Sequence, residues 1–577
     1  MIMRQIGKCI GAAFVLFFLV ALGNVYAGGR PFITRWEGKA GEALKIPIVG
    51  KYTVVVKNAG GDELKREEVS ITDLAAPYTF TPESDGEYLV EAGPEGVEYI
   101  RMVEFYQEGS CEQLLWVEQF GDVVWTSMES AFHKCSKMQF KDGIDKPNLE
   151  RVEKMNFMFW ACSSFNQPLE EWNVSKVVYM FGMFSDCTAF NQPLEKWDVS
   201  KVVDMSRMFE DCSSFNQPLE GWNVSKVMFM RRMFDGCSSF NQPLEGWNVS
   251  QVTDISGMFD GCSSFNQPLE GWNVSKVTDM NEMFEGCSSF NQPLEGWDVS
   301  KVTDMNKMFE GCSSFNQPLG KWEIQKNLDL SKTAMSPFNY SQSLVGWANQ
   351  SDIASGLEIK ASGRHYNAQG QRARATLTTE KGWILTGDAY QGSGLALSPQ
   401  KVHLGVGQEC ELTLESWGLE DGETVAFSGM GGVVVLSTEP ELNGQHTFRI
   451  KAIQEGYITL KATSSNQNLE ATCQVKTQAA VAPTQLTLNR RELRLEKGQK
   501  VHFLLGYTPA EYVLKGYEVT TLPEGYIKVI KQSDDTFLVE ALQPTPDGTP
   551  VTLTVKAAHG SAEEVTCQVT VDPKLVA

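Results

Sequence analysis

Hydrophobic and polar positions follow one another in the middle of the chain in a pattern that repeats every 25 residues. A fixed period of this length is the signature of a repeat architecture, in which one copy cannot bury its apolar face alone and is completed by its neighbours. The sequence therefore predicts a solenoid. The string Phe-Asn-Gln-Pro-Leu marks its seven copies, beginning at Phe165, Phe190, Phe215, Phe240, Phe265, Phe290 and Phe315.

Comparing the copies with one another separates fixed positions from variable ones. In one copy, polar residues such as Lys276, Asn281 and Glu282 are replaced at the equivalent positions of other copies. Fixed apolar and variable polar positions indicate an inside and an outside. The fixed positions of this copy are Cys262, Phe265, Leu269, Trp272, Val274, Val277, Met280, Met283 and Phe284.

The pattern within a copy predicts one short strand and one short helix. Met280, Met283, Phe284 and Cys287 are spaced i, i+3, i+4 and i+7, which places them on one face of a helix. Trp272 to Val274 alternates apolar and polar residues, as in a strand that pairs in parallel from copy to copy. This is the leucine-rich-repeat plan.

Both ends of the array have diverged copies that are typical of caps. Met128 to Cys135 matches the predicted helical half of a copy, and Phe338 to Trp347 is a diverged version of the predicted turn and strand. A capped array of this kind is expected to end near Gln391-Gly392-Ser393-Gly394, a linker-like stretch.

The flanking segments predict all-β domains. Alternating runs at 51–57 and 86–91 indicate a small antiparallel sandwich, and two later stretches with related sequences indicate tandem Ig-like domains. The predicted fold class is mixed, a leucine-rich-repeat-like solenoid flanked by β-sandwiches. Its expected parts are a signal peptide (1–27), an N-terminal sandwich (28–110), the solenoid with caps (111–390) and Ig-like domains at 391–478 and 479–577.

The first 27 residues have the pattern of a secretory signal, with charge from Arg4 and Lys8 and an apolar run from Ile10 to Leu22. We expect cleavage after Ala27. The alternative, an uncleaved membrane anchor, needs about 20 apolar residues, and this run is shorter. The signal predicts a location outside the cytoplasm. No later segment is apolar enough to cross a bilayer, so no membrane insertion is expected after cleavage.

The charge of the chain narrows the class of partner. Lys and Arg number 50 against 72 Asp and Glu, which gives a formal net charge of −22. Nucleic acids and anionic lipids need a basic surface, so this balance argues against both as partners.

The repeat also resembles a known family. Trp297 to Met305, followed by Met-Phe-x-x-Cys-x-x-Phe-Asn-Gln-Pro-Leu at Met308 to Leu319, resembles the surface-protein repeat of the BspA family. The similarity spans about Cys111 to Asp388, and the tandem modules are similar to bacterial Ig-like modules. The resemblance implies a leucine-rich-repeat protein at a bacterial surface, with host extracellular proteins or surface proteins of other bacteria as partners.

Two fixed columns of side chains allow a chemical as well as a structural interpretation. The repeat cysteines, from Cys162 to Cys312, are expected to be buried reduced thiols, with a disulfide ladder as the alternative. The repeat tryptophans, from Trp172 to Trp322, are expected in the core, with sugar stacking on an exposed column as the alternative. The fixed Asn-Gln pair, as at Asn241, is expected to form a ladder that satisfies backbone groups between copies.

Catalysis, cofactors and metals have no support in the sequence. The six histidines are scattered singly, and no Cys-x-x-Cys pair or catalytic motif is present. In the first Ig-like domain, Cys410 and Cys473 are candidates for a disulfide, which the second domain lacks because Val501 replaces the first cysteine.

Five residues depart from the polar character of the variable positions and are the candidate binding residues. They are Tyr179, Phe181, Phe229, Arg231 and Arg232. Exposed aromatic and arginine residues are typical of interface hot spots. The alternative for Phe229 is packing against the neighbouring copy.

The sequence therefore predicts a secreted or cell-surface binding protein without enzymatic activity, adhesin-like, whose solenoid recognises proteins. Carbohydrate binding by the array or the Ig-like domains is an alternative. A structural stalk without a ligand is another.

Overall fold

The computed structural model divides into two compact units, which are described separately. The first unit holds Met1–Phe215 and Trp222–Phe240, and the second holds Asn216–Gly221 and Asn241–Ala577. The predicted signal peptide lies outside the described residues. These are 29–72, 76–93, 96–100, 110–420, 423–436, 444–465, 469–480, 482–489, 492–508, 517–531, 536–546, 549–559 and 562–572.

The first unit opens with a seven-stranded sheet of order β4-β3-β6-β1-β8-β9, in which β7 also pairs with β3. A second sheet pairs β2 with β5. The predicted strands at 51–57 and 86–91 lie in β3 and β6, and the sheet extends past residue 110 through β8 and β9. The elements are β1 (Phe32–Gly38), β2 (Leu44–Ile46), β3 (Ile48–Asn58), β4 (Glu63–Ile71), β5 (Tyr78–Phe80), β6 (Gly86–Ala92), β7 (Val97–Ile100), α2 (Ser110–Gln113), β8 (Leu114–Gln119) and β9 (Gln139–Phe140).

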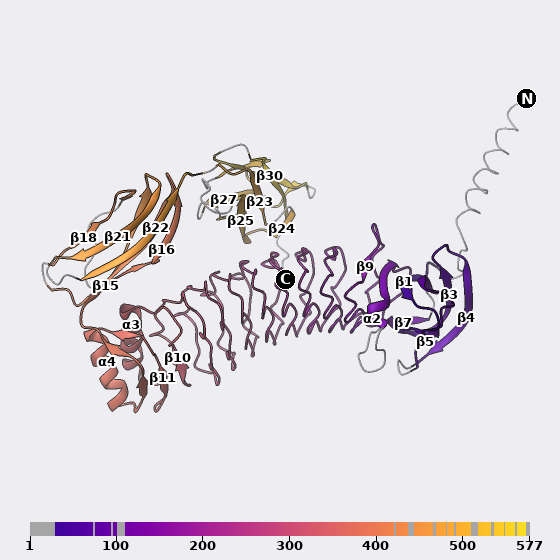
Figure 1. The fold of residues 1–577 in the computed structure, drawn as a ribbon, viewed down its shortest axis with the longest axis horizontal. Coiled ribbons are helices and arrows are strands. Elements are labelled where there is room, and N and C mark those ends of the chain that lie inside the picture. Colours follow the sequence, from indigo (N-terminus) through magenta and orange to yellow (C-terminus); the bar gives the residue numbers. More distant parts are fainter. Residues whose placement is uncertain are drawn as a thin grey trace, which may run out of the picture. The chain divides into compact units, whose positions relative to one another are not determined.

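The repeat copies are built from tight turns, and the predicted helix in each copy is wrong. Figure 1 draws them as successive loops between β9 and β10 (Leu328–Asp329), without a helical coil. Within the predicted helix, Glu282 and Gly286 have φ of +58° and +72°, which a right-handed helix cannot accommodate. Hydrogen bonds of i to i+3 type, such as Met283 N to Met280 O at 3.3 Å, close the turns instead.

The predicted strand at Trp272 to Val274 is also wrong. Its residues form no ladder, and the Trp272 amide donates to the Leu269 carbonyl at 3.0 Å within a turn of the same copy. Parallel pairing occurs a few residues later, as isolated bridges that join Asp279 to Asp254 and to Asp304. Parallel contact between successive copies is therefore present, but at one residue per copy.

The division into inside and outside follows the sequence prediction. Every fixed Cys, Met, Phe and Trp of the copies is buried. The aromatic rings stack between copies, with Trp272 and Trp297 ring centroids 6.5 Å apart and planes 3° apart. Core packing of the tryptophan column is therefore confirmed, and the alternative of an exposed sugar-stacking column is wrong.

Fixed polar atoms link each copy to the preceding one. In the first unit, Cys187 Sγ donates to the Phe159 carbonyl at 2.9 Å, and the Trp197 indole N–H donates to the Leu169 carbonyl at 2.9 Å. The Asn-Gln ladder is confirmed, because the Asn266 amide of the second unit donates to Asn241 Oδ1 at 2.9 Å. Every cysteine that the structure describes is a free thiol, including Cys410 and Cys473.

The array ends in the second unit with true helices. The segment predicted as a diverged turn and strand is instead α3 (Pro337–Ala348), because Ser336 caps its N-terminus and Pro337 occupies its first turn. A three-stranded parallel sheet has the order β10-β11-β13, and β12 pairs with β14. The further elements are β11 (Glu358–Lys360), β12 (His365–Tyr366), α4 (Ala368–Thr379), β13 (Ile384–Thr386) and β14 (Ala389–Tyr390).

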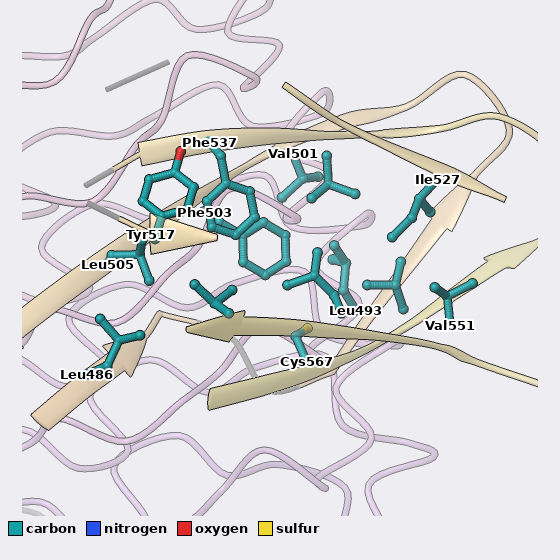
Figure 2. Packing of buried hydrophobic residues seen from close by; sticks show 14 of the residues in the cluster. Leu486, Leu493, Val501, Phe503, Leu505, Tyr517, Ile527, Phe537, Val551 and Cys567 are labelled. Carbon is teal, nitrogen blue, oxygen red and sulfur yellow. The ribbon is translucent and has the colours of Figure 1, made fainter. Parts of the chain in front are cut away.

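Two Ig-like sandwiches complete the second unit, as predicted. The first pairs a sheet of order β15-β17-β20-β19 with one of order β16-β22-β21-β18, and the second repeats this topology as β23-β25-β28-β27 and β24-β30-β29-β26. Each has one hydrophobic core. Figure 2 shows the second core, where the Phe503 and Phe537 rings stack 4.9 Å apart.

The strands of the first sandwich are β15 (Gly394–Ser398), β16 (Lys401–Gly405), β17 (Glu409–Trp417), β18 (Val425–Ser428), β19 (Val433–Val435), β20 (Gln445–Ala452), β21 (Gly456–Ser464) and β22 (Glu470–Gln478). Those of the second are β23 (Gln485–Leu488), β24 (Glu492–Glu496), β25 (Lys500–Thr508), β26 (Tyr517–Leu522), β27 (Ile527–Lys531), β28 (Thr536–Ala541), β29 (Val551–Ala557) and β30 (Val565–Asp572). No helix within the described residues has the length and apolar character needed to cross a bilayer.

Candidate functional site

The candidate binding residues all lie in the first unit, on the outer side of the repeat copies. Isolated parallel bridges join Lys154 to Tyr179, Tyr179 to Asp204 and Asp204 to Phe229. These four residues, here called the bridge row, occupy one repeat position in four successive copies. The bridges hold the backbone of each of these residues in place, so the side chains project from an ordered backbone.

The aromatic members of the bridge row are exposed. Tyr179 is 40% exposed and Phe229 is 39% exposed, and neighbouring Met228 is 41% exposed. Phe229 is therefore not fully covered by the neighbouring copy. Three large apolar side chains at variable positions form an accessible surface in an acidic protein.

Phe181 belongs to a second row beside the first. Its carbonyl accepts the Phe157 amide at 2.8 Å, and its ring meets the Phe157 ring edge to face, with centroids 5.0 Å apart. The Phe157 ring lies against Gly182, where an added Cβ would be only 2.9 Å from it. The absence of a side chain at Gly182 makes room for this ring.

Two aromatic residues of the first copy were not among the residues predicted to bind. Phe157 and Trp160 are half-buried, with ring centroids 5.4 Å apart. The Trp160 indole N–H donates to Asp186 Oδ2 at 2.6 Å, and the ring stacks on His133 at 4.5 Å. The signal was present in the repeat comparison, because later copies have Gly, Arg, Glu or Lys at the position of Phe157.

Basic residues occupy repeat positions close to those of the exposed rings, and ion pairs neutralise only some of these residues. Arg232 pairs with Asp235 at 2.8 Å, and Arg207 pairs with Glu210 at 3.0 Å in the copy before it. Arg231 is exposed and has no ion pair among the residues that the structure describes. The structure therefore distinguishes Arg231, which is free to meet a partner, from Arg232, which already has one.

We call this surface the aromatic face. It consists of Lys154, Phe157, Trp160, Tyr179, Phe181, Asp204, Arg207, Met228, Phe229, Arg231 and Arg232.

The corresponding positions of the second unit have a different character. The bridge position holds Asp254, Asp279 and Asp304, and the residue before it is threonine in each of these copies. The chain thus contains its own internal comparison, in which one backbone arrangement carries lysine, tyrosine, aspartate and phenylalanine in the first unit and aspartate at each of the three bridge positions of the second.

One acidic cluster of the second unit has the composition of a cation site. Carboxylate oxygens of Asp260, Glu282 and Glu285 lie within 4.8 Å of one another. The ammonium of Lys307 lies 3.3 Å from both Glu282 and Glu285, and hydrogen bonding to these two residues raises the pKa of Lys307. A cation of the chain itself therefore compensates this cluster, and we assign no metal to it.

The buried thiols are expected to be unreactive at neutral pH. Burial raises the pKa of the Cys162, Cys187 and Cys212 thiols well above the usual value, so the nucleophilic thiolate is scarce at neutral pH. Their place in the core and their hydrogen bonds explain why they recur in every copy.

Comparison with known proteins gives a family match within the repeat copies. The family described as "Mycoplasma protein of unknown function, DUF285" matches residues 126–246 and 228–347, together less than half of the chain. No curated protein matches the chain.

Several solved structures resemble parts of the chain. Domains 5–6 of the S-layer protein SbsC are 14% identical, over 31% of this chain and 99% of that one, with a TM-score of 0.18. A chimeric titin Z1Z2 carrying a decorin peptide is 14% identical over 32% of this chain and 98% of that one, with a TM-score of 0.20. Dpr2 Ig1–Ig2, in complex with DIP-Theta Ig1–Ig3, is 11% identical over 31% of this chain and 100% of that one, with a TM-score of 0.16. None of these similarities assigns a ligand.

Proposed function

We propose that the chain is a cell-surface binding protein, adhesin-like, whose 25-residue copies build a leucine-rich-repeat-like solenoid with the aromatic face as its protein-recognition surface. Two overlapping matches to one family model, at 126–246 and 228–347, support the repeat. The resemblance of Trp297 to Leu319 to the surface-protein repeat of the BspA family supports the location at a cell surface. The Ig-like sandwiches act as spacers, and binding involves no chemical step.

One observation carries the proposal. Tyr179 and Phe229 expose about two fifths of their surface at a position where the second unit has aspartate. An exposed aromatic ring with an arginine beside it is the composition of a binding hot spot, since the ring buries much area for few rotatable bonds and the guanidinium offers a rigid, planar set of donors. Because bridges already order the backbone, little conformational entropy is lost on binding.

The test compares variants of the full chain in binding to immobilised extracellular-matrix proteins and bacterial surface proteins, measured by biolayer interferometry. Combined Tyr179→Ser and Phe229→Ser should weaken binding at least tenfold. Tyr457→Ser is the matched control, because Tyr457 is 84% exposed but belongs to β21 of the first Ig-like sandwich. Equal binding by the double variant and the original chain would remove the assignment of the aromatic face.

Carbohydrate binding is the second candidate. It is favoured by the Asp204 carboxylate, which lies between the two exposed rings in the bridge row. Aromatic rings offer sugars a stacking surface, and a carboxylate accepts hydrogen bonds from their hydroxyl groups. A glycan array distinguishes the two candidate functions. The carbohydrate function is supported if the double variant Tyr179→Ser, Phe229→Ser loses glycan binding but keeps protein binding. Absence of any binding supports a stalk.

A further inference from the structure

We propose that the partner of the aromatic face is an acidic polypeptide segment with apolar side chains, bound along the bridge row. This inference rests on the proposed function and adds the chemistry of the partner. It is drawn from three properties of the aromatic face: its length, its apolar character and its unpaired charge.

The length of the bridge row suits a short segment of chain. Its four residues lie in successive copies joined by parallel bridges. Neighbouring backbones in such pairing are about 4.8 Å apart, so the row from Lys154 to Phe229 is roughly 14 Å long. An extended segment of about four to five residues covers this length at about 3.3 Å per residue.

Apolar side chains lie on both sides of Asp204 in the middle of the aromatic face. Tyr179 and Phe229 are separated by one intervening copy, and Met228 and half-buried Phe181 flank them. Methionine adapts its shape to different apolar surfaces. Together these side chains offer contacts to leucine- or phenylalanine-sized groups, which a purely acidic segment would not use.

The unpaired charge of the aromatic face is positive on either side of these apolar side chains. Lys154 at one end and Arg231 at the other are exposed and have no ion pair within the described part of the chain. Asp204 lies between them, and its Oδ1 already accepts the Ser206 amide at 2.9 Å. The exposed carboxylate of Glu153 precedes Lys154, which makes Arg231 the stronger of the two attractive groups.

This arrangement is unusual in a chain with a net charge of −22. A basic partner would be attracted almost anywhere on such a surface, and the acidic positions of the second unit would serve it better. Free arginine beside exposed rings instead favours carboxylates, which arginine binds through a planar pair of donors. The charge pattern therefore selects an acidic partner at the aromatic face.

The test uses two fluorescent peptides of 12 residues that alternate leucine or phenylalanine with a charged residue, glutamate in one and lysine in the other. Fluorescence polarisation measures their binding to the full chain in 0.15 M salt. The glutamate peptide should bind at least tenfold more tightly than the lysine peptide. Arg231→Glu should weaken the glutamate peptide about tenfold and strengthen the lysine peptide.

Lys401→Glu, at an exposed position of β16, is the matched charge control and should leave both affinities unchanged. Equal binding of the two peptides, no binding of either, or no effect of Arg231→Glu would overturn the inference. The same holds if anionic phospholipid vesicles bind the aromatic face and the glutamate peptide does not. If the double variant Tyr179→Ser, Phe229→Ser loses binding to its native partner, the proposed function is still supported when the inference about an acidic partner is overturned. The failure of one proposal can therefore be distinguished from the failure of the other.

Discussion

The thiol of Cys212 donates a hydrogen bond to the main-chain carbonyl of Phe184 in the preceding copy, with Sγ and O 3.0 Å apart. The same bond joins Cys237 to Phe209 in the first unit and Cys287 to Phe259 in the second, each at 2.9 Å. The cysteine of the repeat therefore fills a small core position and also supplies a weak donor to the neighbouring copy, which explains why it is fixed.

Replacing this cysteine should destabilise the first unit. Cys212→Ala removes the donor and leaves a small cavity, and we expect it to lower the free energy of unfolding by about 1 to 3 kcal/mol. The Phe184 carbonyl keeps its bond from the Cys187 amide at 2.9 Å, which limits the loss. Urea unfolding under reducing conditions measures the difference, and a variant as stable as the original chain would contradict the role given to the thiol.

Thiol reactivity should separate the repeat cysteines from the others. Burial raises the pKa of Cys212 and Cys237 strongly and that of Cys473 to about 11, whereas Cys111 and Cys410 are only partly buried. At pH 8, iodoacetamide should therefore modify Cys111 and Cys410 first, and the repeat cysteines only after unfolding in urea. Peptide mass spectrometry reads the order. Early modification of the repeat cysteines would mean that their column meets solvent.

Glu171 should contribute to the stability of the first unit, and this contribution should depend on pH and on salt. Hydrogen bonds from Lys196 at 2.9 Å and Lys146 at 3.0 Å hold the pKa of Glu171 at about 2, below its ordinary value of 4.5. A lowered carboxyl pKa stabilises the fold above the ordinary value, and this contribution is lost as the pH falls toward 2. The stability difference between the original chain and Glu171→Gln should therefore shrink between pH 4.5 and 2.

High salt gives the matched control for this ion-pair network. The three side chains are exposed, so 1 M salt should reduce the difference at neutral pH as well, because it screens them. A difference that is independent of both pH and salt would show that Glu171 acts through packing.

Gly182 should be needed for the shape of the aromatic face. Its φ is +57°, and an added Cβ would meet the Phe157 ring at 2.9 Å. Gly182→Ala should cost about 1 kcal/mol for the left-handed backbone and about 1 to 3 kcal/mol for overpacking. It should also change the fluorescence of Trp160, because the displaced Phe157 ring lies against that indole.

Gly356→Ala is the matched control, since Gly356 has a φ of +70° and nothing within 4 Å of an added Cβ. This variant should lose only the stability that corresponds to a left-handed backbone at a residue with a side chain. Equal losses of stability in the two variants, with unchanged Trp160 fluorescence, would contradict the placement of the Phe157 ring.

The repeat pattern was enough to predict which side chains are inside. Cys262, Phe265 and Trp272 are buried as expected, because copies that vary freely only at polar positions reveal the core directly. The local backbone was not predictable in the same way. A spacing of i, i+3, i+4 and i+7 fits a helix, but two successive turns that are interrupted by left-handed residues at Glu282 and Gly286 satisfy it too.

The candidate site was predictable only in part. Tyr179 and Phe229 stood out because complete copies could be compared. Phe157 and Trp160 lie in the first of the seven copies, outside the predicted cap at Met128 to Cys135, and the same comparison could have identified them. Which arginine is free could not be known from the sequence. Arg231 and Arg232 are adjacent, and only the structure shows that Arg232 is the one paired with Asp235.

Site-specific photo-crosslinking on intact cells tests the central claim most directly. A photoreactive phenylalanine derivative replaces either Tyr179 or Asp279, which occupy the same repeat position in the first and second units. We predict a covalent adduct with a partner protein from position 179 and none from position 279. Adducts of equal yield from the two positions, or an adduct from position 279 alone, would contradict the account.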